Sequence, residues 1–555
     1  MSDIGKKVQA RVEAEKKDQP APEAKPTLTD FQIISCAMEN QAGDAAIYIN
    51  LNRDKFRYVE RWGAWLKWVG QYWQKDLKER EATAAVFRVV DEYRRVAAGL
   101  RKFLRKEAGS LPDQGLPAPN PETNLGEGGS DLSDKATKSH LKELSRKISH
   151  LRGNTGRKNV VEYARTCPDA SLVIDGEELD ANPWLLACAS GVIELKTGEL
   201  RPGRPEDYLT CASPTAWQGL EAPCPTFVKF LADILGGNPA LVDYMQRMLG
   251  HALIGEQREH VFLVLSGAKG QNGKGTLMKI LGYVLGMGVM VPVPAEMLLD
   301  QGFVKSSSGP APDIMSLRGR RLAYAEETDE GRRFSSSKVK MLSGGGRLTA
   351  RGTYDLEMSY WDQSHTLILL TNDLPHARAD DQAFWYRIHV VRFPYSFVPN
   401  PNPNNEFEWP VDPTLTDRMK AEASGILAWL VRGCLEYLKY GLAPPAEVLE
   451  ATRAYRAAED LVGRFLAECC EIREGLEVQA AVLYDNFCWW YSHEVSRKRE
   501  FSNTRFGEAL GKKGFAKIKK STNYWLNIAL TDAFKAERAK AEGGEEGRGG
   551  RGLYD

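Results

Sequence analysis

A glycine-rich turn between an apolar run and an apolar helical pattern holds the residues best suited to chemistry. Residues 261–281 have the sequence VFLVLSGAKGQNGKGTLMKIL. Glycines at such a turn let successive backbone N–H groups converge on phosphate oxygens, and the helix N-terminus and a lysine add positive charge. The pattern predicts a phosphate cradle of the P-loop kind. Its candidate residues are Gly267, Gly270, Asn272, Gly273, Lys274, Gly275 and Thr276.

The turn departs from the usual GxxxxGK[ST] spacing in two places. Gly267 stands one residue before the expected first glycine, and Gly275 stands where a magnesium-binding hydroxyl is usual. Thr276 follows directly, so the metal-ligating hydroxyl is assigned to Thr276. The plainer alternative is a turn that only packs a helix on a sheet. The order of strand, turn, lysine and apolar helix favours the cradle.

Two later apolar runs end in polar side chains that nucleotide hydrolysis needs. Residues 321–325 lead into Glu326 and Glu327, and residues 366–370 lead through a threonine into Asn372. One carboxylate can hold the metal's water shell, a second can take a proton from the attacking water, and an amide can orient that water. A single strand end of this kind is more often a solvated edge. In this order after the turn, the pattern predicts catalytic roles.

Size and composition bound the class of protein. The chain has 555 residues, more than one hydrophobic core can serve, and its 74 Lys and Arg balance 74 Asp and Glu. Overall charge therefore says nothing about a nucleic-acid partner, and only local patches can. The nine cysteines contain no CxxC pair, and no apolar run approaches the ~20 residues of a membrane span. We expect a protein of a reducing cytoplasm, without signal peptide or membrane segment.

Changes of composition divide the chain into segments that must position these residues. Residues 1–27 and 534–555 have the composition of disordered tails, and 107–136 that of a linker. Helices are predicted over 90–106 and 138–151. The folded segments are a Trp-rich domain (28–106), a helical and β-rich region (137–235), an α/β nucleotide-binding domain (236–444) and a C-terminal domain of helices and a β-hairpin (445–533).

The Trp-rich domain allows two interpretations. Trp62, Trp65, Trp68 and Trp73 are interleaved with basic residues, a composition that could stack single-stranded bases. Their alternation also suits a small sheet with one buried face. Because large aromatic side chains are highly buried on average, the core interpretation is favoured. Nucleic-acid binding by this domain stays open.

Five ordered strings resemble those of superfamily 3 helicases, and specifically of the poxvirus-type and phage or plasmid primase-helicase family. The strings are NGKGT (272–276), EETDEG (326–331), KMLSGGGRLTAR (340–351), LTNDLP (370–375) and WYRIHVVRF (385–393). Residues 182–200 are similar to the region that precedes the ATPase in this family. The resemblance covers most of 138–393 and implies an α/β fold with an AAA+-like P-loop ATPase core.

The resemblance also implies roles for individual residues. Lys274 would bind the phosphates of ATP, Glu327 would be the catalytic carboxylate, and Glu326 would assist a Mg²⁺ ion. Asn372 would sense the γ-phosphate. Arg387 resembles the arginine finger that stabilises transition-state charge in a neighbouring subunit.

One departure from the family leaves open which residue is the arginine finger. Tyr386 replaces the first arginine of the family's Trp-Arg-Arg string. Arg378 or Arg392 could therefore take the place of Arg387.

Two segments are candidates for contact with DNA. Residues 340–351 correspond to a loop that grips DNA in a ring's channel, although Gly346 replaces the family's aspartate. Residues 496–520 carry nine Lys and Arg against two Glu, a local charge of +7, and resemble the winged-helix module that ends many relatives. A solvated basic face is the alternative for the second segment. The candidate phosphate contacts are Lys340, Arg347, Arg351, Arg505, Lys512 and Lys513.

Together these features predict an ATP- and Mg²⁺-dependent DNA helicase. It would assemble as a homo-hexamer, because a finger acting in trans needs a neighbour and closed head-to-tail contacts give cyclic symmetry. It would act on single-stranded and forked DNA during phage, prophage or plasmid replication in a bacterial host's cytoplasm. We expect no primase activity on this chain, so a separate primase or polymerase could be a partner.

Two other functions are compatible with part of the pattern. The chain could be an initiator-like protein that uses ATP only to assemble on DNA, without unwinding it. A P-loop kinase for a small metabolite would also carry GKGT, but it leaves the strand ending in Thr-Asn, the Thr-Ala-Arg loop and the basic C-terminus unexplained.

Overall fold

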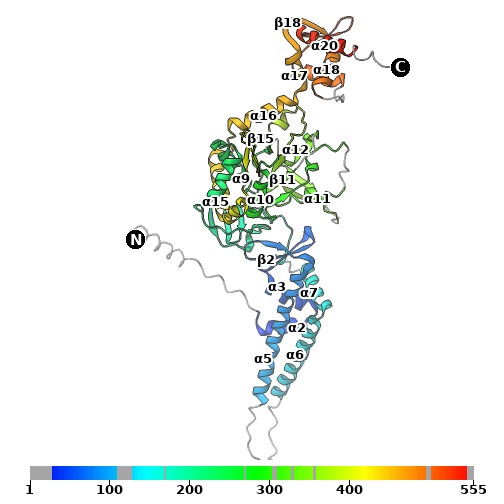
Figure 1. Ribbon diagram of the computed structural model, residues 1–555. Helices are drawn as coiled ribbons and strands as arrows, with labels where there is room; N and C mark the ends of the chain where they lie inside the picture. The colour runs from blue at the N-terminus through cyan, green and yellow to red at the C-terminus, as the bar shows by residue number, and fades with distance from the viewer. Residues whose placement is uncertain are drawn as a thin grey trace, which may run out of the picture. The chain divides into compact units, whose positions relative to one another are not determined.

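The computed structural model describes most of the chain, in two compact units (Figure 1). The described residues are 28–108, 128–167, 171–267, 270–302, 309–326, 331–353, 358–495 and 502–546. The first unit comprises Met1–Val69 with Trp73–Leu179, and the second Gly70–Tyr72 with Asp180–Asp555. The predicted tail 1–27 lies outside the described residues. The division falls within the predicted region 137–235, since residues up to Leu179 belong to the first unit.

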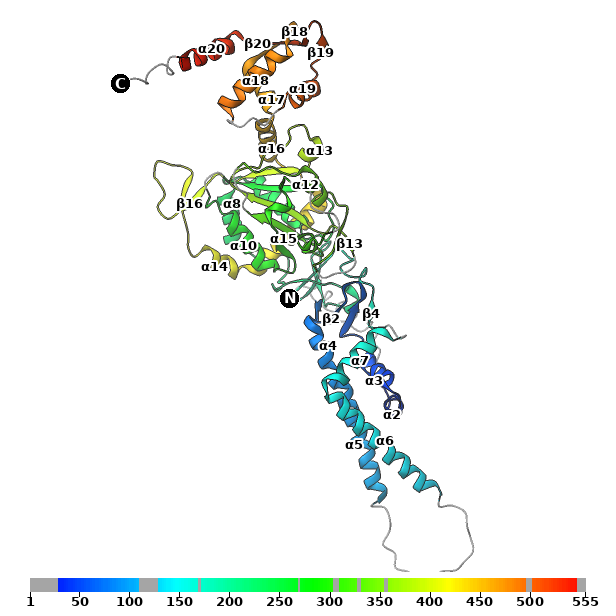
Figure 2. The same cartoon turned by 90° about the vertical axis from the view of Figure 1, so that its right-hand side faces the viewer.

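The first unit combines a small sheet with a pair of long helices that lie side by side, α5 and α6 (Figures 1 and 2). Its helices are α2 (Asp30–Met38), α3 (Gln41–Asn52), α4 (Arg80–Ala85), α5 (Phe87–Ala108), α6 (Gly128–Arg152) and α7 (Asn154–Thr166). Its strands are β1 (Phe56–Val59), β2 (Ala64–Trp68), β3 (Trp73–Lys75) and β4 (Val173–Ile174), in the order β3-β2-β1-β4. Trp65 and Trp73 are fully buried. The prediction of a sheet with a buried aromatic face is therefore confirmed.

The predicted linker is shorter than its composition indicated. Helix α6 begins at Gly128, so residues 128–136 are helical, and only 109–127 lie outside the described residues. The reason is local: after Gly129 no glycine or proline occurs before Gly153, and nothing interrupts a helix over that length. Packing of α6 against α5 adds tertiary support for both helices.

The second unit opens with a four-stranded sheet, ordered β7-β6-β5-β8. Its strands are β5 (Leu185–Cys188), β6 (Gly191–Glu194), β7 (Glu199–Arg201) and β8 (Ala212–Ser213). This confirms the predicted short strands and turns. Helices α8 (Pro225–Ile234) and α9 (Pro239–His251) follow, each with a proline at its start, where a missing N–H costs no hydrogen bond.

A five-stranded parallel sheet forms the centre of this unit and confirms the α/β class. The strands are β9 (Phe262–Ser266), β10 (Met290–Pro292), β11 (Leu322–Glu326), β14 (Thr366–Thr371) and β15 (Ile388–Arg392). Their order is β10-β11-β14-β9-β15. All five residues of β9 except Ser266 are fully buried, as expected for a strand covered on both faces.

Helices cover both faces of this sheet. Leu263 and Leu265 of β9 face a core shared with α8, α9, α10 and α15, whereas Phe262 and Val264 face a core shared with α12, α13 and α16. The sheet is thus the middle of three layers. These helices and their smaller neighbours are α10 (Lys274–Leu285), α11 (Pro312–Met315), α12 (Ser336–Leu342), α13 (Gln382–Trp385), α14 (Leu415–Ala421), α15 (Ala423–Tyr440) and α16 (Ala446–Glu459).

Two strand pairs stand apart from the central sheet. One is the antiparallel pair β12 (Arg347–Ala350) and β13 (Ser359–Asp362), and the other is the parallel pair β16 (Ser396–Val398) and β17 (Glu408–Pro410). The segment 340–351, predicted as one DNA-contacting loop, is therefore the end of α12, a turn and the strand β12.

The end of the chain has a core of its own, in which Phe465, Phe487 and Phe506 are packed together. Its elements are α17 (Leu461–Cys469), β18 (Cys470–Gln479), α18 (Ala480–Glu494), α19 (Asn503–Lys512), β19 (Lys517–Lys519), β20 (Asn523–Leu530) and α20 (Asp532–Glu546). The strands form an antiparallel sheet ordered β18-β20-β19.

The prediction that residues 534–555 form a disordered tail is wrong for their first part. Helix α20 extends to Glu546, and the buried side chain of Phe534 anchors its first turn. Alanine, lysine, glutamate and arginine fill the middle of this helix, and all four favour helix formation. Separately, none of the described helices combines the length and apolar character needed to cross a bilayer.

Close contact between α9 and α15 gives a first test of the fold. A Cβ added at Gly250 would lie 2.1 Å from the backbone nitrogen of Cys434, a neighbour that cannot move aside. We expect Gly250→Ala to lower the free energy of unfolding by at least about 2 kcal/mol, measured by urea denaturation followed through tryptophan fluorescence.

Gly282→Ala is the matched control. Gly282 lies in α10 and a Cβ there would meet nothing within 4 Å, so alanine should leave stability unchanged or raise it by up to about 1 kcal/mol. Equal stability of the two variants would contradict the packing described for α9 and α15.

Candidate active site

The carboxyl ends of β14 and β11 and the turn that follows β9 border one cavity of about 910 Å³. Strand β14 lies between the other two, so Thr371 is opposite Ser266 and Glu326 is opposite Leu370. Open parallel α/β sheets bind ligands at this edge. The strand order thus brings together side chains that are about 100 residues apart in sequence.

Lys274 begins helix α10 and is buried within this cavity's wall, with 8% of its surface exposed. Its ammonium donates hydrogen bonds to Oδ1 of Asn372 at 3.0 Å, to Oδ1 of Asn272 at 3.1 Å and to the carbonyl of Gly267 at 3.3 Å. Among the described residues, its acceptors are therefore all uncharged. Burial lowers the pKa of Lys274 to about 8. Within the described part of the chain, the ammonium thus has hydrogen-bond partners but no counter-ion.

The loop before Lys274 is held by the segment that follows β15. Asn272 donates from Nδ2 to the carbonyl of Tyr395 at 2.8 Å, and the backbone N–H of Phe397 donates to the carbonyl of Gln271 at 2.9 Å. Gly273 adopts a φ of +85°, and a Cβ there would lie 2.6 Å from Ile234, so only glycine fits. The loop is thus fixed at its base, close to the start of α10.

Oxygen-bearing side chains line the cavity beside the lysine. They are Thr276, Glu326, Thr371, Asn372 and Asp373. The predicted catalytic residue Glu327 lies outside the described residues. In the part of the chain that the structure describes, no group of three or more His, Cys, Asp or Glu is arranged to hold a metal ion. Glu326 and Thr276 could supply two oxygen ligands, a small number of the kind that suits Mg²⁺ when phosphates and water complete its shell.

Four apolar side chains form another part of the cavity's lining. Phe230 and Leu415 line it together with Phe397 and Val411, which lie in and just beyond the β16–β17 pair. None of these four residues was singled out from the sequence. Nothing in their local sequence marks them, because they reach the cavity through the fold of a segment that lies more than 120 residues beyond the glycine-rich turn.

Arg387 lies at the opposite edge of the sheet from Lys274. It directly precedes β15, and its carbonyl accepts a hydrogen bond of 2.7 Å from the N–H of Phe262, the first residue of β9. Its guanidinium donates to the carbonyl of Ala383. Arg392, at the other end of β15, is paired in register with Ser266. Arg387 is therefore not part of the cavity formed by its own chain.

The three candidate DNA contacts in 340–351 have different surroundings. Lys340 is half-buried and forms an ion pair of 3.0 Å with Asp381. Arg347 is exposed and pairs with the equally exposed Asp362 at 3.2 Å. Arg351 is half-buried, and its carbonyl accepts a hydrogen bond from Ala311.

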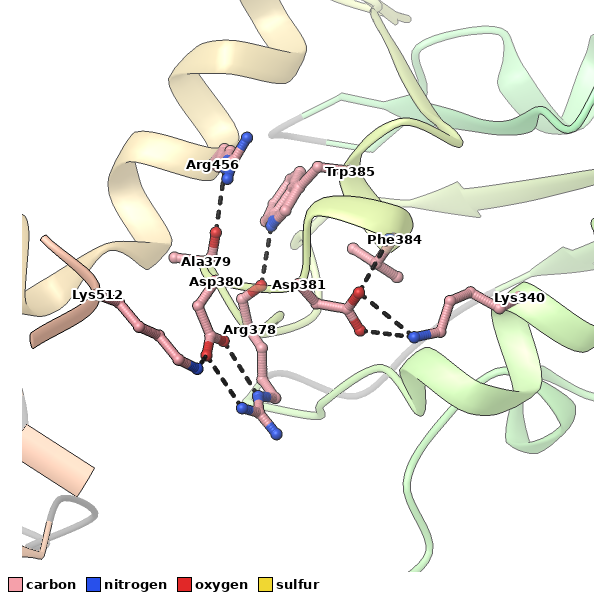
Figure 3. Close-up of polar contacts among 9 residues, drawn as sticks. All are labelled: Lys340, Arg378, Ala379, Asp380, Asp381, Phe384, Trp385, Arg456 and Lys512. Atoms are coloured by element: carbon pink, nitrogen blue, oxygen red, sulfur yellow. Dashed lines mark hydrogen bonds and ion pairs between the residues drawn. The ribbon is translucent and has the colours of Figure 1, made fainter. Parts of the chain in front are cut away.

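The other three candidates gather at one place. Arg505, Lys512 and Lys513 line a second cavity, between α19, the end of α16 and the residues before α13. Lys512 pairs with Asp380 at 2.5 Å and Lys513 pairs with Asp460. Figure 3 shows Lys512 and Lys340 approaching the adjacent residues Asp380 and Asp381 from opposite sides.

Comparison with known proteins shows what this chain is similar to. Residues 45–236 match the family described as "D5 N terminal like". An Acanthamoeba polyphaga mimivirus protein named "Putative helicase L207/L206" is 27% identical over 372 residues, which cover 64% of this chain and 38% of that protein. The African swine fever virus protein named "Putative primase C962R" is 24% identical over 385 residues, covering 65% and 38%.

Frog virus 3 supplies a further relative, named "Putative helicase 022R", which is 23% identical over 404 residues. Among solved structures, the apo C-terminal region of NrS-1 aligns with 56% of this chain and 76% of that chain, at 12% identity and a TM-score of 0.34. The match to each viral relative spans about two-fifths of that protein's length. The chain is thus related to helicase- and primase-named proteins of large DNA viruses.

The lowered pKa of Lys274 gives a test of the cavity as an anion site. The free ammonium loses its proton as the pH rises through about 8, and a bound polyanion should raise that pKa. Binding of tripolyphosphate should therefore take up about half a proton at pH 8 and close to one above about pH 9. Calorimetry in buffers of different ionisation enthalpy measures this uptake.

Lys274→Arg is the control, because arginine keeps its charge throughout this range. Any proton uptake that the variant retains belongs to the ligand. The affinity of the wild-type protein should also fall by up to about tenfold per pH unit above pH 8, relative to the variant. Identical proton uptake in the two proteins would contradict the role of Lys274.

Proposed function

We propose that the chain is an ATP-dependent DNA helicase of superfamily 3. The observation that carries the proposal is the buried ammonium of Lys274, which has three uncharged acceptors, among them Asn372 from a neighbouring strand tip. A buried cation of this kind is stabilised when an anion supplies the missing charge. A nucleotide's β- and γ-phosphates would lie against Lys274 and the amides at the start of α10.

Each remaining part of the cavity has a role in hydrolysis under this proposal. The aromatic and apolar side near Phe230 and Phe397 would hold the nucleobase. Thr276 and Glu326 would hold Mg²⁺, which bridges phosphate oxygens and neutralises the charge that develops on them. Asn372 would orient the attacking water, and Glu327 would take its proton.

Ring assembly would supply an arginine to the cavity, whose described lining contains none. Arg387 lies at the sheet edge away from its own Lys274, a position that suits action on a neighbour's nucleotide. A head-to-tail contact of this kind repeats around a closed ring, and we propose a homo-hexamer. Lys340, Arg347 and Arg351 would then contact DNA in the ring's channel, with the C-terminal domain as a winged-helix-like second contact.

The names of the viral relatives support helicase and primase functions alike. We favour the helicase, because Lys274, Asn372 and Glu326 line one cavity, as binding and cleavage of a nucleotide would require. An initiator-like protein that assembles on DNA without unwinding would share this cavity. Only strand separation distinguishes it from a helicase.

ATP hydrolysis tests the site directly. Lys274→Ala should reduce ATPase activity to below about 1% of wild type, since it removes the charge that holds the γ-phosphate. Lys439→Ala, at an exposed position at the end of α15, should leave the activity unchanged. Single-stranded DNA should stimulate the wild-type ATPase, and a forked duplex should be unwound only with ATP and Mg²⁺. Unaltered turnover in Lys274→Ala would refute the assignment of the site.

Mixing two inactive variants tests whether the finger acts in trans. Arg387→Ala subunits keep an intact cavity, and Lys274→Ala subunits keep an intact finger. Equal mixtures that exchange subunits should recover about a quarter of wild-type ATPase activity, because half of the sites are intact and half of those face an intact finger. Arg378→Ala and Arg392→Ala tested in the same mixture would show whether another arginine fills this role. No recovery with any of the three would contradict a finger in trans.

A further inference from the structure

A second cavity, larger than the candidate active site, lies within the second unit and is named here the basic cleft. Its walls are the segment before α13, the end of α16 and the start of α17, and helix α19. Its volume is about 1240 Å³. Its charged lining residues are Arg333, Arg378, Arg453, Arg456, Arg464, Arg505, Lys512, Lys513, Asp380, Glu459, Asp460 and Glu508.

The charge of the basic cleft favours a polyanion. Eight Lys and Arg face four carboxylates, an excess of four positive charges. Small-molecule pockets usually measure about 300–1,000 Å³ and are mostly apolar, with few charged groups. The basic cleft is larger and far more charged. A phosphate backbone that extends across the cleft fits both features.

Asp380 holds two of these cations in place. Its carboxylate forms ion pairs with Lys512 from α19 at 2.5 Å and with Arg378 at 3.1 Å (Figure 3). Hydrogen bonding from Arg378 and then from Lys512 keeps the pKa of Asp380 below its usual range, although burial opposes this. The carboxylate therefore stays charged at working pH. It competes for the same cations that a phosphate would bind.

The backbone around Asp380 is fixed independently of these ion pairs. Arg456 donates to the carbonyl of Ala379 at 3.1 Å, and the indole of Trp385 donates to the carbonyl of Arg378 at 2.9 Å. Asp381 caps α13 and pairs with Lys340. The exposed side chain of Asp380 can thus exchange partners without movement of the chain that carries it.

We propose that the basic cleft binds the phosphate backbone of single-stranded DNA, and that phosphates displace Asp380 from Lys512 and Arg378. Asp380 acts as a built-in competitor that limits how tightly the strand is held. The inference rests on the proposed function for its ligand. It goes beyond that function by assigning the strand to the basic cleft, and by predicting that the carboxylate of Asp380 lowers the affinity for DNA.

The proposal predicts that removal of an acid strengthens binding and removal of a base weakens it. Binding of fluorescein-labelled oligothymidylate to the full chain, without nucleotide, is followed by fluorescence anisotropy. Asp380→Asn keeps the size of the side chain and should tighten binding about three- to tenfold. The slope of log K against log salt should become steeper by about 0.7, the value for one further phosphate contact on a single strand.

Two further variants and a control complete the test. Lys512→Gln and Arg453→Gln, on opposite walls of the basic cleft, should each weaken binding several-fold and make the salt slope shallower. Asp532→Asn removes a carboxylate that pairs with Lys535 elsewhere in the C-terminal part of the chain. It changes the net charge as Asp380→Asn does, and it should leave affinity unchanged. Thermal unfolding of each variant checks that the fold is retained.

The results separate failure of this inference from failure of the proposed function. Equal tightening by Asp380→Asn and Asp532→Asn would reduce the effect to net charge and overturn the competitor role. Unchanged binding in Lys512→Gln and Arg453→Gln would overturn the site, even if single-stranded DNA still stimulates ATP hydrolysis. If single-stranded DNA neither binds to the wild-type protein nor stimulates its ATP hydrolysis, the proposed helicase function itself is refuted. If the Asp380→Asn variant does not fold, the Lys512→Gln and Arg453→Gln variants still test whether the basic cleft binds the strand.

Discussion

The ammonium of Lys274 is buried and has no carboxylate partner among the described residues, and this is the constraint on which the candidate site depends. Removing a charged group from water is costly, and uncharged oxygens offset only part of that cost. Lys274 nevertheless sits beneath the glycine-rich turn, with its pKa lowered to about 8. The described protein atoms around it accept its hydrogen bonds, but none of these acceptors carries a negative charge. A polyanion that entered the cavity would find the positive charge of Lys274 already positioned.

The order of the parallel strands determines what surrounds that charge. Asn372 reaches Lys274 because β14 is the neighbour of β9, the strand that leads into the glycine-rich turn. The insertion of β14 between β9 and β11 places the amide 3.0 Å from the ammonium and keeps Glu326 at the border of the same cavity. The adjoining segment then runs from Asn372 through Asp380 to Asp381. One stretch of ten residues thus contacts the lysine at one end and two candidate DNA-binding lysines at the other.

Much of the fold followed from local pattern. Apolar runs marked β9, β11 and β14, and helical periodicity marked parts of α5 and α6, because burial imposes a period that a sequence displays. The errors also have local causes. Residues 128–136 and 534–546 are polar, and composition alone made them a linker and a tail. They are helical because their glycines, at 128–129 and 543–544, lie only near an end of each helix, and because each segment is joined to a part that packs, α5 for the first and Phe534 for the second.

The sequence by itself determined the residue types at the centre of the site: glycines that allow a close turn, a lysine at a helix start, and polar side chains at strand ends. These depend on neighbours in the chain, so spacing reveals them. Only the tertiary structure decided which distant groups meet them. The apolar wall with Phe397 and Val411, and the choice of Asp380 and Asp381 as partners of Lys512 and Lys340, arise from packing between segments far apart in sequence. No local period or spacing encodes such contacts, because they are set by how the layers pack together.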